Sequence, residues 1–344
     1  GQDNRRSGSN AEAILDLIET YSFVKWGHAK PHAITEYGDI PKGFGKGYSD
    51  LRSSQELNAM NHILFTLLDR EDRLDISVPF ITSKSPWHFV EVGEYEPYLA
   101  DLWRPNPDHI ERGDVLKYIP TMKMRFYELW AGVRGNRIVT VSDHPDIRVH
   151  GFLDGRDLFL CLNNLVDDEQ TLTLSPSAPL GKPAQVRVRR LFVSQTEAAR
   201  LTGKDLPVLP QRVTLAPHET VVFRITLPAA PERQRTVTSH TRYSTAHLQP
   251  IKAGETLVFP FDAVPAGDGG RATIRMSLGR KHDRSKQPEF TVNGKAVAVP
   301  TNWAGYDQAN RSDFFGAIEV PVPVDLLEER TVVELTFPDD GGHV

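Results

Sequence analysis

The chain has 344 residues, of which 39% are hydrophobic and 25% charged, and this is enough apolar material for two or three globular domains. The formal net charge of −5 provides no overall positive field that would hold nucleic acid or an anionic membrane. The single cysteine, Cys161, lies in an apolar run, which excludes a disulfide framework and a cysteine-rich zinc site and predicts a buried thiol. We expect no cofactor and no metal, and no apolar stretch approaches the roughly 20 residues that cross a bilayer.

A helix and a short strand are the first elements in chain order. Residues 9–12 (Ser-Asn-Ala-Glu) match a capping box, and apolar residues then recur at helical spacing. Pro31 excludes a continued helix. The next residues, 33–36 (Ala-Ile-Thr-Glu), predict a short buried strand that delivers Glu36 to its carboxyl end, directly before Tyr37 and a glycine turn.

A glycine-rich loop and a second helix come next. Residues 39–50 carry Phe44 and Tyr48 between glycines, which permit unusual backbone angles and leave the aromatic rings free to meet a ligand. Residues 53–56 (Ser-Ser-Gln-Glu) form a second capping box, and the apolar spacing after it predicts a long helix. Alternating apolar residues at 74–80 then predict another strand.

Two aromatic side chains follow this second strand. Trp87 and His88 lie in a Ser-Pro-Trp-His sequence that we interpret as a turn. Residues 91–112 contain prolines and no clear period, as in a long functional loop. A helix is expected around residues 121–130 at the end of this region.

The hydrophobic period changes to two from Arg137 onward. This alternation predicts a β-sandwich at residues 135–230 and a second one at 231–344 that is truncated at its C-terminus, with a hairpin at Asn293-Gly294. Residues 1–134 have the element order of the last two βα units of a (β/α)8 barrel. The predicted fold class is therefore α/β plus all-β, and we expect the chain to be a fragment cut at both ends.

The end of the first predicted strand is where catalytic chemistry is expected. Barrel enzymes carry catalytic residues at strand ends, and retaining glycosidases pair a nucleophilic carboxylate with an acid/base carboxyl about 5–5.5 Å away. Glu36 fits the nucleophile, Trp87 provides an indole on which a sugar ring can rest, and His88 can donate to a hydroxyl. The alternatives are an ion-paired structural Glu36, a Trp87 that only packs, and a His88 that is an ordinary surface residue.

Two charged clusters offer further hypotheses. Three glutamates of the irregular region are the nearby carboxylates that could supply an acid/base within this chain, or they are ordinary solvated loop residues: Glu91, Glu94 and Glu96. A basic cluster could meet sulfate esters on an anionic glycan, or it is a solvated face: Arg275, Arg280, Lys281, Arg284 and Lys286, with His282. Nucleic-acid binding is poorly supported, because no aromatic stacking platform accompanies the basic residues.

Several longer motifs support a family resemblance that covers nearly the whole chain. The sequence resembles glycoside hydrolase family 86, the β-agarases and β-porphyranases that cut red-algal galactans, at residues 5–16, 33–38, 83–88, 277–280, 305–308 and 337–343. The resemblance implies a clan A barrel and retaining endo-hydrolysis of β-1,4 linkages in agarose or porphyran. It also implies Glu36 as nucleophile on strand seven. Our hypothesis adds Tyr37 and Trp87 as residues that shape the subsite.

The resemblance places the acid/base glutamate after strand four of the barrel, which is not in this sequence. We therefore expect this chain to be inactive alone, within an enzyme that is secreted or located at the cell surface or in the periplasm. Its partner would be the galactan, with Phe44 and Tyr48 as further substrate contacts. The alternative is a non-catalytic carbohydrate-binding or scaffold protein whose two β-domains hold glycan. The sequence does not indicate an oligomeric state.

Overall fold

The computed structural model describes residues 6–40, 42–45, 47–92, 95–110, 117–177, 180–232, 236–265 and 269–344. They form two compact units, each described here by itself. Unit 1 combines residues 7–31 with 236–344, and unit 2 consists mainly of residues 32–235. The described chain is mostly β, with few helices. The domain boundaries expected from the sequence stay a prediction.

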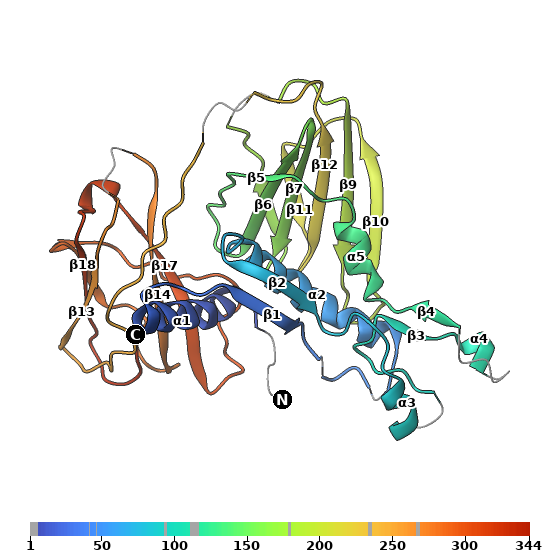
Figure 1. Ribbon diagram of the computed structural model, residues 1–344, viewed down its shortest axis with the longest axis horizontal. Helices are drawn as coiled ribbons and strands as arrows, with labels where there is room; N and C mark the ends of the chain where they lie inside the picture. Colours follow the sequence, from blue (N-terminus) through green and yellow to red (C-terminus); the bar gives the residue numbers. More distant parts are fainter. Residues whose placement is uncertain are drawn as a thin grey trace. The chain divides into compact units, whose positions relative to one another are not determined.

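Unit 2 begins with a strand, a helix and a second strand (Figure 1). These are β1 (His32–Tyr37), α2 (Asp50–Leu68) and β2 (Leu74–Pro79). Strands β1 and β2 pair in parallel, so both carboxyl ends lie at the same edge of their sheet. The predicted order of strand, helix and strand is confirmed.

Both predicted helix starts are wrong by a few residues. Helix α2 begins at Asp50, and the hydroxyl of Ser49, not Ser53, accepts the backbone N–H of Arg52 at 3.1 Å. Helix α1 (Gly8–Trp26) has Ser7 at its N-cap, so the predicted cap Ser9 lies inside the helix. The physical reason is that tertiary contacts compete with the caps. Glu12 and Glu56, the glutamates of the predicted capping boxes, form ion pairs with residues distant in sequence instead of binding the backbone at the start of their own helices.

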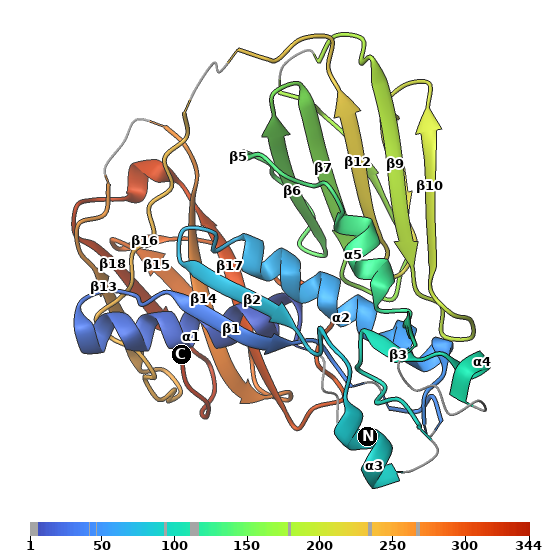
Figure 2. The same cartoon turned by 45° about the vertical axis from the view of Figure 1, so that its right-hand side comes forward.

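The segment after β2 contains more regular structure than the sequence indicates (Figure 2). Its elements are α3 (Pro86–Val92), β3 (Trp103–Pro105), α4 (Pro107–Ile110), β4 (Tyr118–Pro120) and α5 (Met124–Trp130). The predicted turn at Trp87 is therefore wrong. Pro86 is the first residue of α3, a position where the backbone N–H that proline lacks would have no partner within the helix. The predicted loop contains β3, which pairs antiparallel with β4. The helix predicted near residue 130 is confirmed as α5.

The rest of unit 2 is an antiparallel β-structure with two sheets. One has six strands in the order β10-β9-β12-β7-β6-β5, and the other pairs β11 with β8. The strands are β5 (Asn136–Ile138), β6 (Ile147–Asp154), β7 (Asp157–Asn164), β8 (Gln170–Thr173), β9 (Gln185–Phe192), β10 (Arg200–Leu206), β11 (Arg212–Leu215) and β12 (Thr220–Thr226). Cys161 on β7 is buried, as predicted. The alternation at residues 138–141 predicts a strand, but β5 ends at Ile138, and Val139 and Val141 beyond it are exposed.

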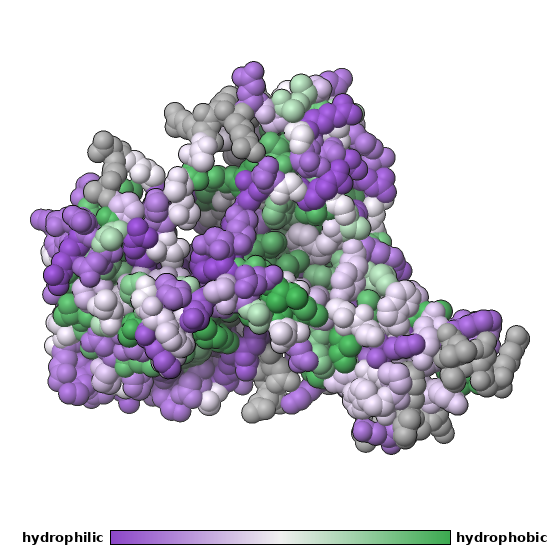
Figure 3. All heavy atoms as spheres, viewed as in Figure 1, coloured by the Kyte–Doolittle hydropathy of each residue, from purple (hydrophilic) through white to green (hydrophobic). Residues whose placement is uncertain are grey.

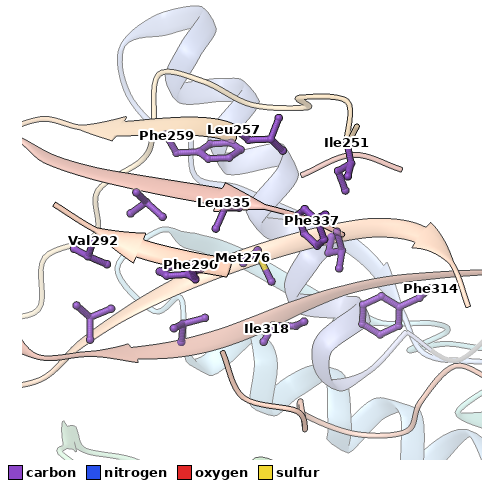
Figure 4. Packing of buried hydrophobic residues seen from close by; sticks show 14 residues of the cluster. Ile251, Leu257, Phe259, Met276, Phe290, Val292, Phe314, Ile318, Leu335 and Phe337 are labelled. Atoms are coloured by element: carbon purple, nitrogen blue, oxygen red, sulfur yellow. The ribbon is translucent and has the colours of Figure 1, made fainter. Parts of the chain in front are cut away.

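Unit 1 packs α1 against a second β-structure. Its strands are β13 (Thr256–Phe261), β14 (Ala272–Lys281), β15 (Glu289–Val292), β16 (Lys295–Ala296), β17 (Asp313–Val322) and β18 (Thr331–Thr336), with a 3-10 turn at Val324–Leu326. The order β13-β18-β15-β16 forms one sheet, and β14 pairs with β17 in the other. Figure 4 shows the apolar core between them, with Phe290, Met276 and Leu335 pointing inward. The predicted hairpin at Asn293-Gly294 joins β15 to β16 and is confirmed, with both residues at positive φ.

Helix α1 is held to the strands of unit 1 by charge as well as by packing. The guanidinium of Arg275 on β14 pairs with Asp16 at 3.0 Å and with the buried Glu12. The hydroxyl of Tyr243 donates to the carboxylate of Glu19 at 2.6 Å. On the visible face of the molecule, hydrophilic and hydrophobic residues are interspersed (Figure 3), and no helix of the described residues is long and apolar enough to cross a membrane.

Candidate glycan-cleaving site

The carboxyl end of β1 presents Glu36 to solvent. Glu36 is exposed, whereas Tyr37, the last residue of the strand, is buried. The backbone N–H of Phe80, directly after β2, donates to the carbonyl oxygen of Tyr37 at 2.9 Å. The ends of β1 and β2 are thereby fixed side by side, and Glu36 stands beside the chain that leaves β2.

An aromatic cluster lies after β2, around the ring of Tyr98. Trp87 and His88, in the first turn of α3, have ring centroids 5.5 Å and 5.3 Å from that of Tyr98, and Phe80 contacts the same ring at 6.3 Å. Trp87 is 51% exposed, so one part of its indole is open to a ligand. The surface over α3 is pale in Figure 3, the colour of residues of intermediate hydropathy. An exposed indole edged by a tyrosine suits the apolar face of a sugar ring.

The phenol of Tyr98 is also subject to the charges of several carboxylates. Burial raises the pKa of the Tyr98 phenol, and the negative charges of Glu56, Asp101 and Glu36 raise it further. The structure brings together two residues predicted from the sequence, Trp87 and His88, around the Tyr98 ring. The effect of Glu36 on the pKa of Tyr98 is the smallest of these effects, and the place of Glu36 in the site stays a prediction.

Tyr98 itself was missed by the sequence analysis. It lies in the predicted irregular region, where no period distinguishes one aromatic residue from another. The sequence signal that could have found it is the local density of aromatic residues between Tyr95 and Trp103. Its importance comes from tertiary contacts with Phe80 and with Trp87 and His88 on α3.

Asp101 fixes the start of α3, and with it the position of Trp87 and His88. The backbone N–H and the hydroxyl of Ser85 donate to the two oxygens of the Asp101 carboxylate at 2.9 Å and 2.5 Å. Asp101 is fully buried, and burial raises the pKa of its carboxyl while the bonds from Ser85 lower it. The hydrogen bonds between Ser85 and Asp101 therefore fix the first turn of the helix that carries the Trp87 indole.

Tyr37, Phe44 and Tyr48, the other predicted substrate contacts, have different surroundings. Burial raises the pKa of the Tyr37 phenol, with a smaller effect of Tyr127, so Tyr37 is placed to support the site from within. The Tyr48 hydroxyl donates to Asp50 at 2.8 Å, and burial together with this bond raises the pKa of Tyr48. Phe44 is half-buried, and within the described part of the chain no ring contact links it to Tyr98. Their contacts with a ligand stay predictions.

The acidic cluster proposed as an internal acid/base is divided by the structure. The Glu96 carboxylate accepts the backbone N–H of Tyr48, so it holds the glycine-rich loop. Glu91 is exposed on α3, and Glu94 lies outside the described residues. Among the described residues, no hydrogen bond or ion pair links Glu91 or Glu96 to Glu36.

The basic cluster in unit 1 is used largely within the protein. Arg275 pairs with α1, Arg280 is buried against Asp339, and Lys281 pairs with Asp313 at 2.9 Å. Lys286 donates to the carbonyl oxygen of His282 at 3.2 Å. Most of these basic side chains already have partners within the protein, which weakens the hypothesis that they form an anion-binding face. Among the described residues, no group of three or more histidine, cysteine or acidic side chains could hold a metal ion.

Comparison with known proteins gives the family. Residues 146–249 match the model described as porphyranase β-sandwich domain 1, and residues 258–344 match β-porphyranase A C-terminal. β-Porphyranase A of Phocaeicola plebeius is 39% identical over 347 residues, which cover 100% of this chain and 47% of that protein. The chain belongs to glycoside hydrolase family 86. The alignment covers all of the predicted site.

Two solved structures support this family membership. A β-porphyranase of glycoside hydrolase family 86 from the human gut bacterium Bacteroides plebeius superimposes with a TM-score of 0.92 at 40% identity, covering 98% of this chain and 59% of that one. A second family 86 protein, solved in complex with neoagarooctaose, gives a TM-score of 0.93 at 33% identity, covering 100% and 55%. The chain spans about half the length of two curated relatives that it matches, 47% of each.

Proposed function

We propose that this chain forms part of a retaining, endo-acting glycoside hydrolase that cleaves β-1,4 linkages in red-algal galactans, with Glu36 as the nucleophile. The observation that carries the proposal is the parallel pairing of β1 with β2, which places the end of β1, with Glu36, at the same sheet edge as the chain that continues from β2 to the exposed Trp87. A carboxylate at a strand end can act as the nucleophile of sugar cleavage, and an exposed indole near the same sheet edge suits the apolar face of the sugar. Family membership supports this assignment.

The parallel pair of β1 and β2 supports assignment to a (β/α)8 barrel. Parallel sheets are normally covered on both faces, yet Ile76 on β2 is 50% exposed. A parallel pair with this exposure needs further strands and helices. We infer that these belong to the part of the relatives that this chain does not span, and that β1 and β2 are strands seven and eight of the complete barrel.

The proposed mechanism divides the work between this chain and the rest of the barrel. Glu36 attacks the anomeric carbon while an acid/base glutamate, supplied by sequence that this chain does not span, protonates the departing oxygen. Water then cleaves the glycosyl-enzyme with the same glutamate as base. Trp87 supports the apolar face of the sugar, and His88 donates to a hydroxyl.

The experiment that tests this proposal compares the chain alone with the complete enzyme. This chain alone is expected to release no reducing ends from agarose or porphyran, because it lacks the acid/base group. The complete enzyme should cleave one of the two galactans and give the β-anomer as first product, which proton NMR of early reaction mixtures detects. Turnover by the chain alone would favour an acid/base among Glu91, Glu94 and Glu96. A complete enzyme that binds galactan without cleaving it would favour the non-catalytic alternative.

Replacing Trp87 by alanine in the complete enzyme should weaken substrate binding. The variant loses the stacking surface but leaves Glu36 in place, so we expect KM to rise about 10-fold, which corresponds to ~1.4 kcal/mol, with a smaller change in kcat. Steady-state kinetics on an oligosaccharide of defined length measure both constants. Trp26, which is similarly exposed on α1, is the matched control, and Trp26→Ala should leave KM unchanged. Equal effects of the two substitutions would contradict a role for Trp87 in binding.

A further inference from the structure

Hydrogen bonds join three chain segments of unit 2, one of which carries Tyr98 of the aromatic cluster. The backbone N–H of Ile81 donates to the carbonyl oxygen of Ala100 at 3.0 Å, and the backbone N–H of Leu102 donates to that of Ser83 at 3.0 Å. The hydroxyl of Thr121 donates to the carbonyl oxygen of Asp101 at 2.7 Å. These hydrogen bonds therefore connect three segments: the chain leaving β2, the segment that carries Tyr98 and the segment before α5.

A single buried ammonium group connects these segments. Lys123, just before α5, is fully buried, and its Nζ donates to the carbonyl oxygens of both Phe80 and Ala100. Phe80 is the first residue after β2, and Ala100 lies two residues after Tyr98. One side chain thus holds both segments that bring the Tyr98 ring to Trp87.

The charge of Lys123 is balanced by Glu56, which extends from the middle of α2. Its Oε2 lies 2.7 Å from Nζ, and both side chains are almost completely buried. Burial raises the pKa of Glu56 to about 7, against the effect of the nearby ammonium, and burial lowers the pKa of Lys123, against the effect of Glu56. Such a pair is costly to bury and contributes little net stability over an apolar replacement, so its presence here calls for an explanation other than stability.

We propose that Lys123 is a positioning residue for the cleavage reaction, which fixes the end of β2 and the Tyr98 segment relative to Glu36 by binding the carbonyl oxygens of Phe80 and Ala100. The proposal rests on the proposed function. Asp101 follows Ala100 directly and holds the start of α3 through Ser85. Lys123 therefore sets the position of Trp87 and His88 as well, without contacting substrate.

The test separates the two carbonyl bonds from the ion pair. Glu56→Gln removes the negative charge but keeps an amide oxygen for Lys123, so the bonds to Phe80 and Ala100 remain. The double variant Glu56→Gln/Lys123→Met removes those bonds and leaves no unpaired charge. In the complete enzyme we expect Glu56→Gln to keep kcat within about 3-fold, and the double variant to lower kcat by about 10–100-fold, since small misplacements of reacting groups have effects of this size.

A second measurement does not depend on activity. Hydrogen exchange of the Ile81 amide, which bonds to Ala100, should be at least about 10-fold faster in the double variant than in Glu56→Gln, because the local structure opens more readily. A purely structural role would lower the melting temperature while kcat per folded molecule stays equal in the two variants, and that result overturns the proposal. If the methionine variant does not fold, Glu56→Gln/Lys123→Gln is subjected to the same criteria.

The exchange measurement also distinguishes failure of this inference from failure of the proposed function. If the wild-type complete enzyme cleaves no galactan, the proposed function is contradicted, and exchange at Ile81 still decides whether Lys123 fixes the two segments. Unchanged exchange in the double variant overturns the role of Lys123 even in an active enzyme.

Discussion

Replacing Glu36 by glutamine in the complete enzyme is expected to lower kcat by about 1,000-fold or more, which corresponds to at least ~4 kcal/mol of transition-state stabilisation. Glutamine has nearly the same shape but cannot attack the anomeric carbon. Because Glu36 is exposed at a strand end and forms no part of the buried core, the variant should fold normally and still bind oligosaccharide. Initial rates on galactan and isothermal titration with an agaro-oligosaccharide measure the two properties.

Glu91→Gln is the matched control for this prediction. Glu91 is an exposed glutamate on the neighbouring helix α3, and the same chemical change there should leave kcat within about 2-fold. A large loss with Glu91→Gln and none with Glu36→Gln would contradict the assigned nucleophile and favour the acidic cluster. Unchanged activity in both variants would contradict Glu36 as the nucleophile and would leave this chain a non-catalytic, glycan-binding part of the enzyme.

Chemical rescue distinguishes a nucleophile at position 36 from an acid/base group at the same position. In Glu36→Ala, azide can enter the vacated space and attack the anomeric carbon from the side that Glu36 used. The new carbon–nitrogen bond forms as the protonated sugar oxygen leaves, so the product is a glycosyl azide of α configuration. A β-glycosyl azide would instead show that position 36 holds the acid/base group.

The position of Glu36 was predictable from the sequence because its determinants are local. Pro31 limits where a helix can continue, and the short apolar run after it leaves room for one strand that ends at Glu36. The contact of Trp87 with Tyr98 was not predictable, because it depends on how the chain returns from α3 through a region without periodicity. The helical start at Pro86 was also open to a different interpretation, as a Ser-Pro sequence is equally typical of a turn.

The two misplaced helix caps show where local patterns lose to tertiary structure. Glu12 and Glu56 each occupy the position that a capping box requires, but the structure pairs them with Arg275 and Lys123. Both partners lie far along the chain, so no sequence window contains the competing interaction. The same limit applies to the β-structures, where the alternating pattern predicted strands but did not indicate which strands pair.

The basic cluster of unit 1 illustrates the same limit for a functional hypothesis. Its arginines and lysines appear equivalent in sequence, yet Arg280 and Lys281 point to opposite faces of β14. The Arg280 side chain is fully buried, whereas that of Lys281 is 66% exposed. Arg280 forms an ion pair with Asp339 at 2.8 Å and donates to the carbonyl oxygens of Ser285, Asp339 and Asp340. These bonds tie the C-terminal segment to β14.

Replacing Arg280 by methionine is therefore expected to destabilise unit 1 by about 3–5 kcal/mol, because it leaves a carboxylate and three carbonyl oxygens without their buried donor. Lys281→Met is the matched control on the adjacent residue, and its unfolding midpoint should stay close to that of the wild type, since an exposed ion pair contributes little. Chemical denaturation of both variants, followed by fluorescence and circular dichroism, measures the difference. If Arg280→Met unfolds like the wild type but the complete enzyme loses affinity for sulfated galactan, the guanidinium binds anions and does not hold the C-terminal segment.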